Sequence, residues 1–156
     1  MHNKRILLVG GFHKADALAS SLIKKGYEVT VINDNYNHCT RLAENKDITV
    51  VNGDGTKLFV LEDANAFNSD IVIALTQKDD DNLVICQLCK KRFSIKKSVA
   101  LVNDPKKIDF FHKMGIDSVV CAINAVTNII EQETFEDEIE AIIPSKEGNE
   151  NEKQKV

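Results

Sequence analysis

The first 32 residues alternate short apolar runs with a stretch of helical period, and no other feature constrains the fold as strongly. Residues 5–9 predict a buried strand, which is followed by the turn residues Gly10 and Gly11. Gly26 follows two lysines, as expected at the end of a helix, and residues 29–32 predict a second strand. Between the strands, apolar residues recur at helical spacing: Ala15, Leu18, Ala19, Leu22 and Ile23. The segment therefore predicts a complete β-α-β unit with parallel strands.

The alternation continues to residue 120 and predicts an α/β fold: a Rossmann-like, doubly wound parallel sheet with strand order 3-2-1-4-5-6. Thr76 and Asp79 have the spacing of a capping box for the longest helix, and Asp104 before Pro105 is a favoured helix start. In this strand order the ligand crevice lies at the carboxyl ends of strands one and four. Further strands are expected at residues 48–51, 71–75, 98–102 and 118–120, and further helices at 36–44, 58–64, 79–93 and between 105 and 115.

The composition changes after Cys121 and divides the chain into three predicted parts. Residues 1–121 form the Rossmann-like domain, residues 122–143 a crossover helix with an acidic segment, and residues 144–156 a polar, mobile tail. The helix carries an apolar stripe that could pack on its own sheet or pair with a second copy. This stripe consists of Ala122, Val126, Ile129 and Ile130.

Charge and cysteine content exclude several classes of protein. With 20 Lys and Arg against 24 Asp and Glu, the formal charge is −4, so the basic field that binds nucleic acid is missing. No apolar run is long enough to span a bilayer and no secretory signal is present, so we expect a cytoplasmic protein. The cysteines lack the paired spacing of a zinc site. Cys86 and Cys89 lie within a predicted helix, where we expect buried packing rather than redox chemistry.

The turn after the first strand partly matches the dinucleotide fingerprint G-x-G-x-x-G/A. Such a turn binds phosphate because its glycines let the backbone come close while a helix N-terminus presents free N–H groups. Gly10 and Ala15 fit, but Phe12 takes the second glycine position, where a side chain crowds the phosphates. Asn33 replaces the acid that would accept ribose hydrogen bonds, with Asp34 one residue later. Two interpretations stay open: a phosphate site, or a structural turn with Phe12 filling an empty cleft.

Several segments together resemble the nucleotide-binding N-terminal domain of the regulator of potassium conductance family, also called TrkA-N or KTN. Gly-Asp-Gly-Thr follows the third strand at residues 53–56, Ala-Leu-Thr lies at residues 74–76, and Val-Asn-Asp-Pro at residues 102–105. This combination is hard to match otherwise. The similarity also includes residues 10–15, 29–33 and 114–117, and it runs in register from residue 5 to residue 130.

The resemblance implies a cytoplasmic regulatory domain without catalytic activity. Such a domain senses an adenine nucleotide (ATP, ADP or AMP) or NAD(H). Whether the nucleotide is bound is then transmitted to an integral membrane potassium channel or transporter, which the domain contacts at the inner face of the membrane. The family also implies a homodimer or larger ring, paired through the helix after the sixth strand. Carried over by position, the phosphate site comprises Gly10, Gly11, Phe12 and His13, the ribose site Asn33 and Asp34, the adenine side Asp54, Gly55 and Thr56, and the cleft wall Ala74, Leu75 and Thr76.

Four departures from the family pattern leave a second function open. The family usually has glycine, arginine, an acid and arginine where this chain has Phe12, His13, Asn33 and Leu101. The departures at His13 and Leu101 remove positive charge near the cleft. The alternative is a module of the same fold that acts in assembly without binding a nucleotide.

Three of the polar site residues have a structural alternative. Asp54 and Thr56 could cap the short helix that follows them, and Thr76 could cap the next one, instead of contacting a ligand.

A small nicotinamide-dependent oxidoreductase is a disfavoured function, because neither tyrosine belongs to a Tyr-x-x-x-Lys pair that could supply an acid or base.

Overall fold

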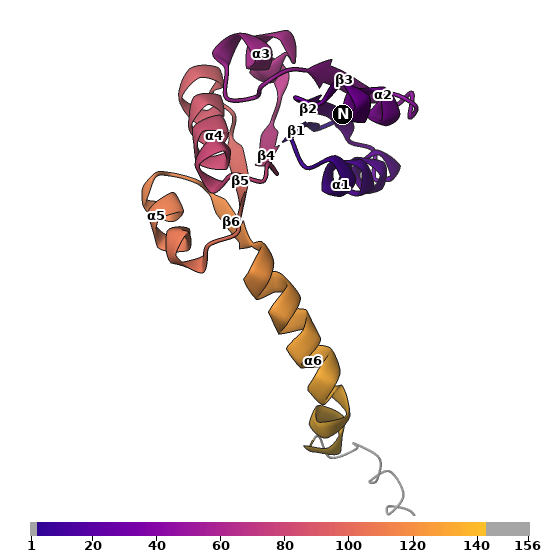
Figure 1. Ribbon diagram of the computed structural model, residues 1–156, viewed down its shortest axis with the longest axis vertical. Helices are drawn as coiled ribbons and strands as arrows, with labels where there is room; N and C mark the ends of the chain where they lie inside the picture. Colours follow the sequence, from indigo (N-terminus) through magenta and orange to yellow (C-terminus); the bar gives the residue numbers. More distant parts are fainter. Residues whose placement is uncertain (1–2, 143–156) are drawn as a thin grey trace, which may run out of the picture. The chain divides into compact units, whose positions relative to one another are not determined.

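The computed structural model describes residues 3–142, and over this range the chain forms a six-stranded parallel sheet flanked by helices (Figure 1). The strand order is β3-β2-β1-β4-β5-β6 with every adjacent pair parallel, which confirms the predicted doubly wound sheet. From β1 the strands are added first toward one edge of the sheet, as β2 and β3, and then toward the other, as β4, β5 and β6, so the winding reverses between β1 and β4, where the ligand crevice was expected. The strands are β1 Arg5–Val9, β2 Glu28–Asn33, β3 Ile48–Asn52, β4 Ile71–Ala74, β5 Lys97–Val102 and β6 Ser118–Cys121.

Helices cover both faces of this sheet. Successive strand residues point to opposite sides, and apolar residues lie on both sides, so each face is buried by helices. In β1, Ile6 and Leu8 belong to one apolar cluster, which also contains Ala15 and Ala19 of α1. Leu7 belongs to a second cluster, on the face covered by α4. The helices are α1 Phe12–Lys24, α2 Tyr36–Leu42, α3 Leu58–Asp63, α4 Asp79–Phe93, α5 Ile108–Lys113 and α6 Ala122–Ile142, with the 3₁₀ turns η1 Ala66–Asn68 and η2 Pro105–Lys107.

The predicted capping box of α4 is wrong. The helix begins after Lys78, and Asp79 is its first residue, with its carboxylate accepting the backbone N–H groups of Asn103 at 2.8 Å and Asp104 at 3.1 Å. Thr76 instead donates its hydroxyl to Asn82 Oδ1 at 2.6 Å. A tertiary contact between the loops after β4 and β5 therefore replaces the local cap.

The other predicted helix boundaries agree more closely with the structure. Asp104 accepts the N–H of Lys106 at 3.0 Å, but it opens the 3₁₀ turn η2, and α5 follows it. Gly26 and Gly115 follow α1 and α5 with φ of 89° and 90°, the left-handed conformation predicted for a glycine after a helix.

The chain divides into two compact units between Asn124 and Ala125, within α6. In the second unit, Val126, Ile129 and Ile130 of the predicted stripe are between 56% and 59% exposed. No described helix is long and apolar enough to cross a membrane. The predicted tail, residues 144–156, lies outside the described residues, and the three predicted parts remain a prediction.

Candidate functional site

A cavity of about 750 Å³ lies where the carboxyl ends of β1, β2 and β4 meet the loops that follow them. This volume is within the usual range of small-molecule sites. The cavity is lined by every residue of the predicted binding set except Ala74, which is fully buried in the core. The fold thus brings together four segments of the sequence that the family resemblance had selected separately.

The glycine turn lies against the loop after β4. Gly10 and Gly11 have φ of 80° and 70°, a left-handed conformation that disfavours other residues. A Cβ at Gly10 would lie 2.7 Å from Thr76 Cγ2, and one at Gly11 would lie 2.7 Å from the carbonyl oxygen of Leu75. These contacts explain both glycines without a ligand. The turn nevertheless leads directly into α1, whose first N–H groups have no acidic side chain near them in the first turn.

Phe12 forms part of the cavity wall without filling the cavity. Its ring stacks on the imidazole of His38, with ring centroids 4.2 Å apart and planes 12° apart, and its centroid is 4.7 Å from that of His13. The stack joins the start of α1 to α2. Since the volume of about 750 Å³ is what remains with the ring in this place, the structure does not support a cleft plugged by Phe12.

The end of β2 is held by a dense set of hydrogen bonds. Asn33 is only 4% exposed, and its Oδ1 accepts the N–H of Asn35 at 2.9 Å. Its carbonyl oxygen accepts the Nδ2 of Asn52 at 3.0 Å and the Sγ of Cys39 at 3.3 Å. The neighbouring Asp34 is exposed and lines the cavity.

The loop after β3 is closed by its own side chains. Asp54 Oδ1 accepts the N–H of Thr56 at 2.9 Å and its hydroxyl at 2.7 Å, and these bonds hold the pKa of Asp54 below its usual value. Neither residue caps α3, whose first flanking residue is Lys57. Gly55 is buried, and a Cβ there would collide with Val9 Cγ1. The loop therefore closes tightly over the end of β1.

Asn82 is a buried polar residue to which the sequence analysis assigned no role. It is fully buried, and its Oδ1 accepts both the N–H of Thr76 at 2.9 Å and the hydroxyl at 2.6 Å. Its Nδ2 donates to the carbonyl oxygens of Thr76 at 3.0 Å and Leu101 at 2.8 Å. One side chain thus fixes the cavity wall to β5. The sequence feature that could have identified Asn82 is its position as a polar residue among the apolar residues on the helix face that packs on the sheet.

Metal and thiol chemistry have no support among the described side chains. No group of three His, Cys, Asp or Glu side chains is placed to hold a metal ion within the described range. Burial raises the pKa of Cys86 and of Cys89 to about 12, which keeps both thiols protonated. The expected buried packing of these cysteines is confirmed.

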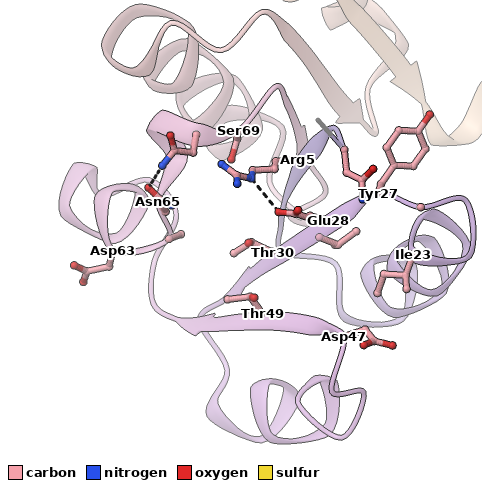
Figure 2. A pocket seen from close by; sticks show the side chains of 15 residues that line it. Arg5, Ile23, Tyr27, Glu28, Thr30, Asp47, Thr49, Asp63, Asn65 and Ser69 are labelled. Carbon is pink, nitrogen blue, oxygen red and sulfur yellow. Dashed lines mark hydrogen bonds and ion pairs between the residues drawn. The ribbon is translucent and has the colours of Figure 1, made fainter. Parts of the chain in front are cut away.

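A second cavity, of about 640 Å³, lies at the opposite edge of the sheet, at the amino ends of β1, β2 and β3 (Figure 2). Arg5 Nε donates to Glu28 Oε2 at 2.9 Å beside it, and Thr30 and Thr49 line it. The sequence analysis did not predict this cavity. Its Arg5 and Glu28 side chains already pair with each other, and no described residue that lines it belongs to the N-terminus of an α-helix, so the first cavity is the stronger candidate.

Comparison with known proteins finds a matching family model and related sequences. The TrkA-N domain model matches residues 6–122. A Trk system potassium uptake protein TrkA homolog of Methanothermobacter thermautotrophicus is 34% identical over 127 residues, which cover 81% of this chain and 58% of the relative. The chain thus spans little more than half the length of this relative.

Two solved structures share the fold. The GsuK channel bound to NAD gives a TM-score of 0.65 at 24% identity, over 76% of this chain and 21% of the channel chain. The Kef CTD of Shewanella denitrificans in its AMP-bound form gives a TM-score of 0.67 at 20% identity, over 83% of this chain and 80% of the other. At these identities the likeness establishes the fold alone.

Proposed function

The chain belongs to the TrkA-N domain family, and we propose that it is a regulatory domain of a potassium transport system that senses a nucleotide. One observation carries the proposal: a cavity of about 750 Å³ at the carboxyl ends of β1 and β4, lined by the glycine turn and the start of α1. This is where a doubly wound sheet binds phosphorylated ligands.

The proposed ligand is an adenine nucleotide or NAD(H). The phosphates would meet Gly10, Gly11 and the first N–H groups of α1, and His13 and Lys14 are exposed beside them. The ribose would meet the segment at Asn33, and the base would lie toward the loop at residues 53–56. The NAD of the GsuK structure and the AMP of the Kef CTD structure support this class of ligand.

In this proposal, nucleotide binding acts through a homodimer on a membrane-embedded potassium channel or transporter, and this domain lies at the cytoplasmic face of the membrane. An exposed apolar stripe on α6 supports pairing, because large apolar side chains gain stability when a second copy removes them from water. The hydrogen bonds of Asn82 and Asp79 offer a connection from the cavity to the loops beside β5.

Isothermal titration calorimetry with ATP, ADP, AMP, NAD⁺ and NADH tests ligand binding. We expect heat from at least one nucleotide. Lys14→Glu should weaken binding roughly tenfold, because it reverses a charge at the cavity without touching the core. Lys96→Glu is the matched control, since this exposed lysine does not line the cavity and should leave the affinity unchanged. If none of the five nucleotides gives heat, the alternative function is favoured, in which the domain acts in assembly without binding a nucleotide.

Sedimentation velocity tests the homodimer. Val126→Asp combined with Ile129→Asp should convert a dimer to a monomer, because two charges would enter an apolar interface. Asn128→Asp adds a charge to an exposed polar position of the same helix and should leave the dimer intact. A wild-type chain that sediments as a monomer at all concentrations would reject pairing through α6.

A further inference from the structure

Asn33 has one polar atom that the described protein leaves unused. Its Oδ1 accepts the backbone N–H of Asn35 at 2.9 Å, and only the oxygen of the amide can accept, so the amide orientation is fixed. Its Nδ2 forms no hydrogen bond with any residue that the structure describes, although the side chain is only 4% exposed. The residue lines the cavity at the carboxyl ends of β1 and β4. Nδ2 is therefore a donor available to whatever occupies that cavity.

The position of Asn33 decides what this donor would meet. It is the last residue of β2, beside the glycine turn, where the N–H of Gly10 donates to the carbonyl oxygen of Ile32 at 2.8 Å. In doubly wound folds the residue at this point contacts the adenosine ribose. A carboxylate there accepts a hydrogen bond from the 2′-hydroxyl and repels a 2′-phosphate, whereas an amide N–H can donate to either group.

Two carboxylates line the cavity on this side: Asp34, next to Asn33, and Asp54, in the loop after β3. Both are exposed to water and therefore screened, and Asp54 Oδ1 already accepts two hydrogen bonds within its own loop. His38 lines the same side, and its backbone N–H donates to Asn35 Oδ1 at 3.1 Å. A ribose bound at Asn33 would thus meet a buried neutral donor, with two solvated acids on the same side of the cavity.

We propose that Asn33 determines the class of nucleotide that the cavity admits. Because it replaces a buried acceptor with a donor, an adenosine that carries a 2′-phosphate, as in NADP(H), binds about as well as its unphosphorylated counterpart. The inference rests on the proposed nucleotide-binding function and extends it from adenine nucleotides to their 2′-phosphorylated forms.

Calorimetry on the full chain with two matched ligand pairs tests this. The pairs are AMP with adenosine 2′,5′-bisphosphate, and NAD⁺ with NADP⁺, and each differs only by the 2′-phosphate. For the wild-type chain we expect dissociation constants within about tenfold of each other in each pair. Asn33→Asp can still accept the N–H of Asn35, so the loop is kept, and it should disfavour the phosphorylated ligand by about a further tenfold or more.

Asn37→Asp is the matched control, because it makes the same substitution at an exposed position of α2 that does not line the cavity. It should change the ratio within each pair by less than about threefold, since that charge is solvated. Thermal unfolding of both variants reports whether they fold.

Each other outcome overturns the inference in a recognisable way. A wild-type chain that binds AMP or NAD⁺ but binds the phosphorylated partner more than about tenfold weaker rejects the inference and leaves the proposed function intact. If Asn33→Asp changes the dissociation constants of both members of a pair by the same factor, Asn33 does not discriminate between them, and the inference is rejected. A wild-type chain that binds none of the four ligands rejects the inference, and it rejects the proposed function as well only if ATP, ADP and NADH also give no heat.

Discussion

Replacing Asn82 with alanine should cost a large part of the stability of the domain. The side chain is fully buried and makes four hydrogen bonds, two through each polar atom. Alanine would remove one hydrogen bond from each of three backbone groups: the N–H and carbonyl of Thr76 and the carbonyl of Leu101. At roughly 1 kcal/mol for each group, and more where water does not replace the side chain, we expect a loss of about 3–4 kcal/mol. Domains of this kind are stable by only about 5–15 kcal/mol.

Urea unfolding followed by circular dichroism measures this loss as a shift of the midpoint at constant slope. Asn37→Ala is the control for residue type, because Asn37 is exposed on α2 and should change the free energy of unfolding by less than about 0.5 kcal/mol. Asn82→Asp should be at least as damaging as Asn82→Ala, since it removes both donors and buries a charge. A loss below about 1 kcal/mol for Asn82→Ala would refute the reasoning, because it would mean that the network contributes no more than a single exposed hydrogen bond.

Three further predictions concern separate parts of the domain. Gly55→Ala should lower the free energy of unfolding by about 1–3 kcal/mol in the same urea assay, because the new Cβ collides with Val9 Cγ1 in the core. At Asp117, burial acts to raise the carboxyl pKa, but the hydrogen bonds from Lys90 and Ser98 outweigh it, so the folded pKa is lowered. Asp117→Ala should therefore be less stable than wild type by about 1–2 kcal/mol above about pH 4, and the difference should shrink as the pH falls through the lowered pKa and the carboxylate loses its charge; unfolding across a pH series from about 7 to about 2 measures it. Cys86 and Cys89, with pKa values raised to about 12, should resist iodoacetamide at pH 8 until the protein unfolds, and labelling of either in the native state by mass spectrometry would contradict their burial.

The sheet could be predicted because its signals are local. Strand and helix periods, and the glycines that end α1 and α5, depend on residues within a few positions of each other. Right-handed crossovers then leave few ways to order six parallel strands. The resemblance to a known family supplied the cavity residues position by position, and all but Ala74 line it.

The sequence could not predict the partners of the buried polar side chains. The spacing of Thr76 and Asp79 suggested a local cap, yet the carboxylate of Asp79 bonds to Asn103, 24 residues away. Asn82 bonds to the carbonyl of Leu101, 19 residues away, and the cavity of Figure 2 is lined by strand ends that no motif connects. Periodicity reports which face of an element is buried. The partner that satisfies a buried polar group depends on which distant loop the fold brings within about 3 Å, and only the tertiary structure decides that.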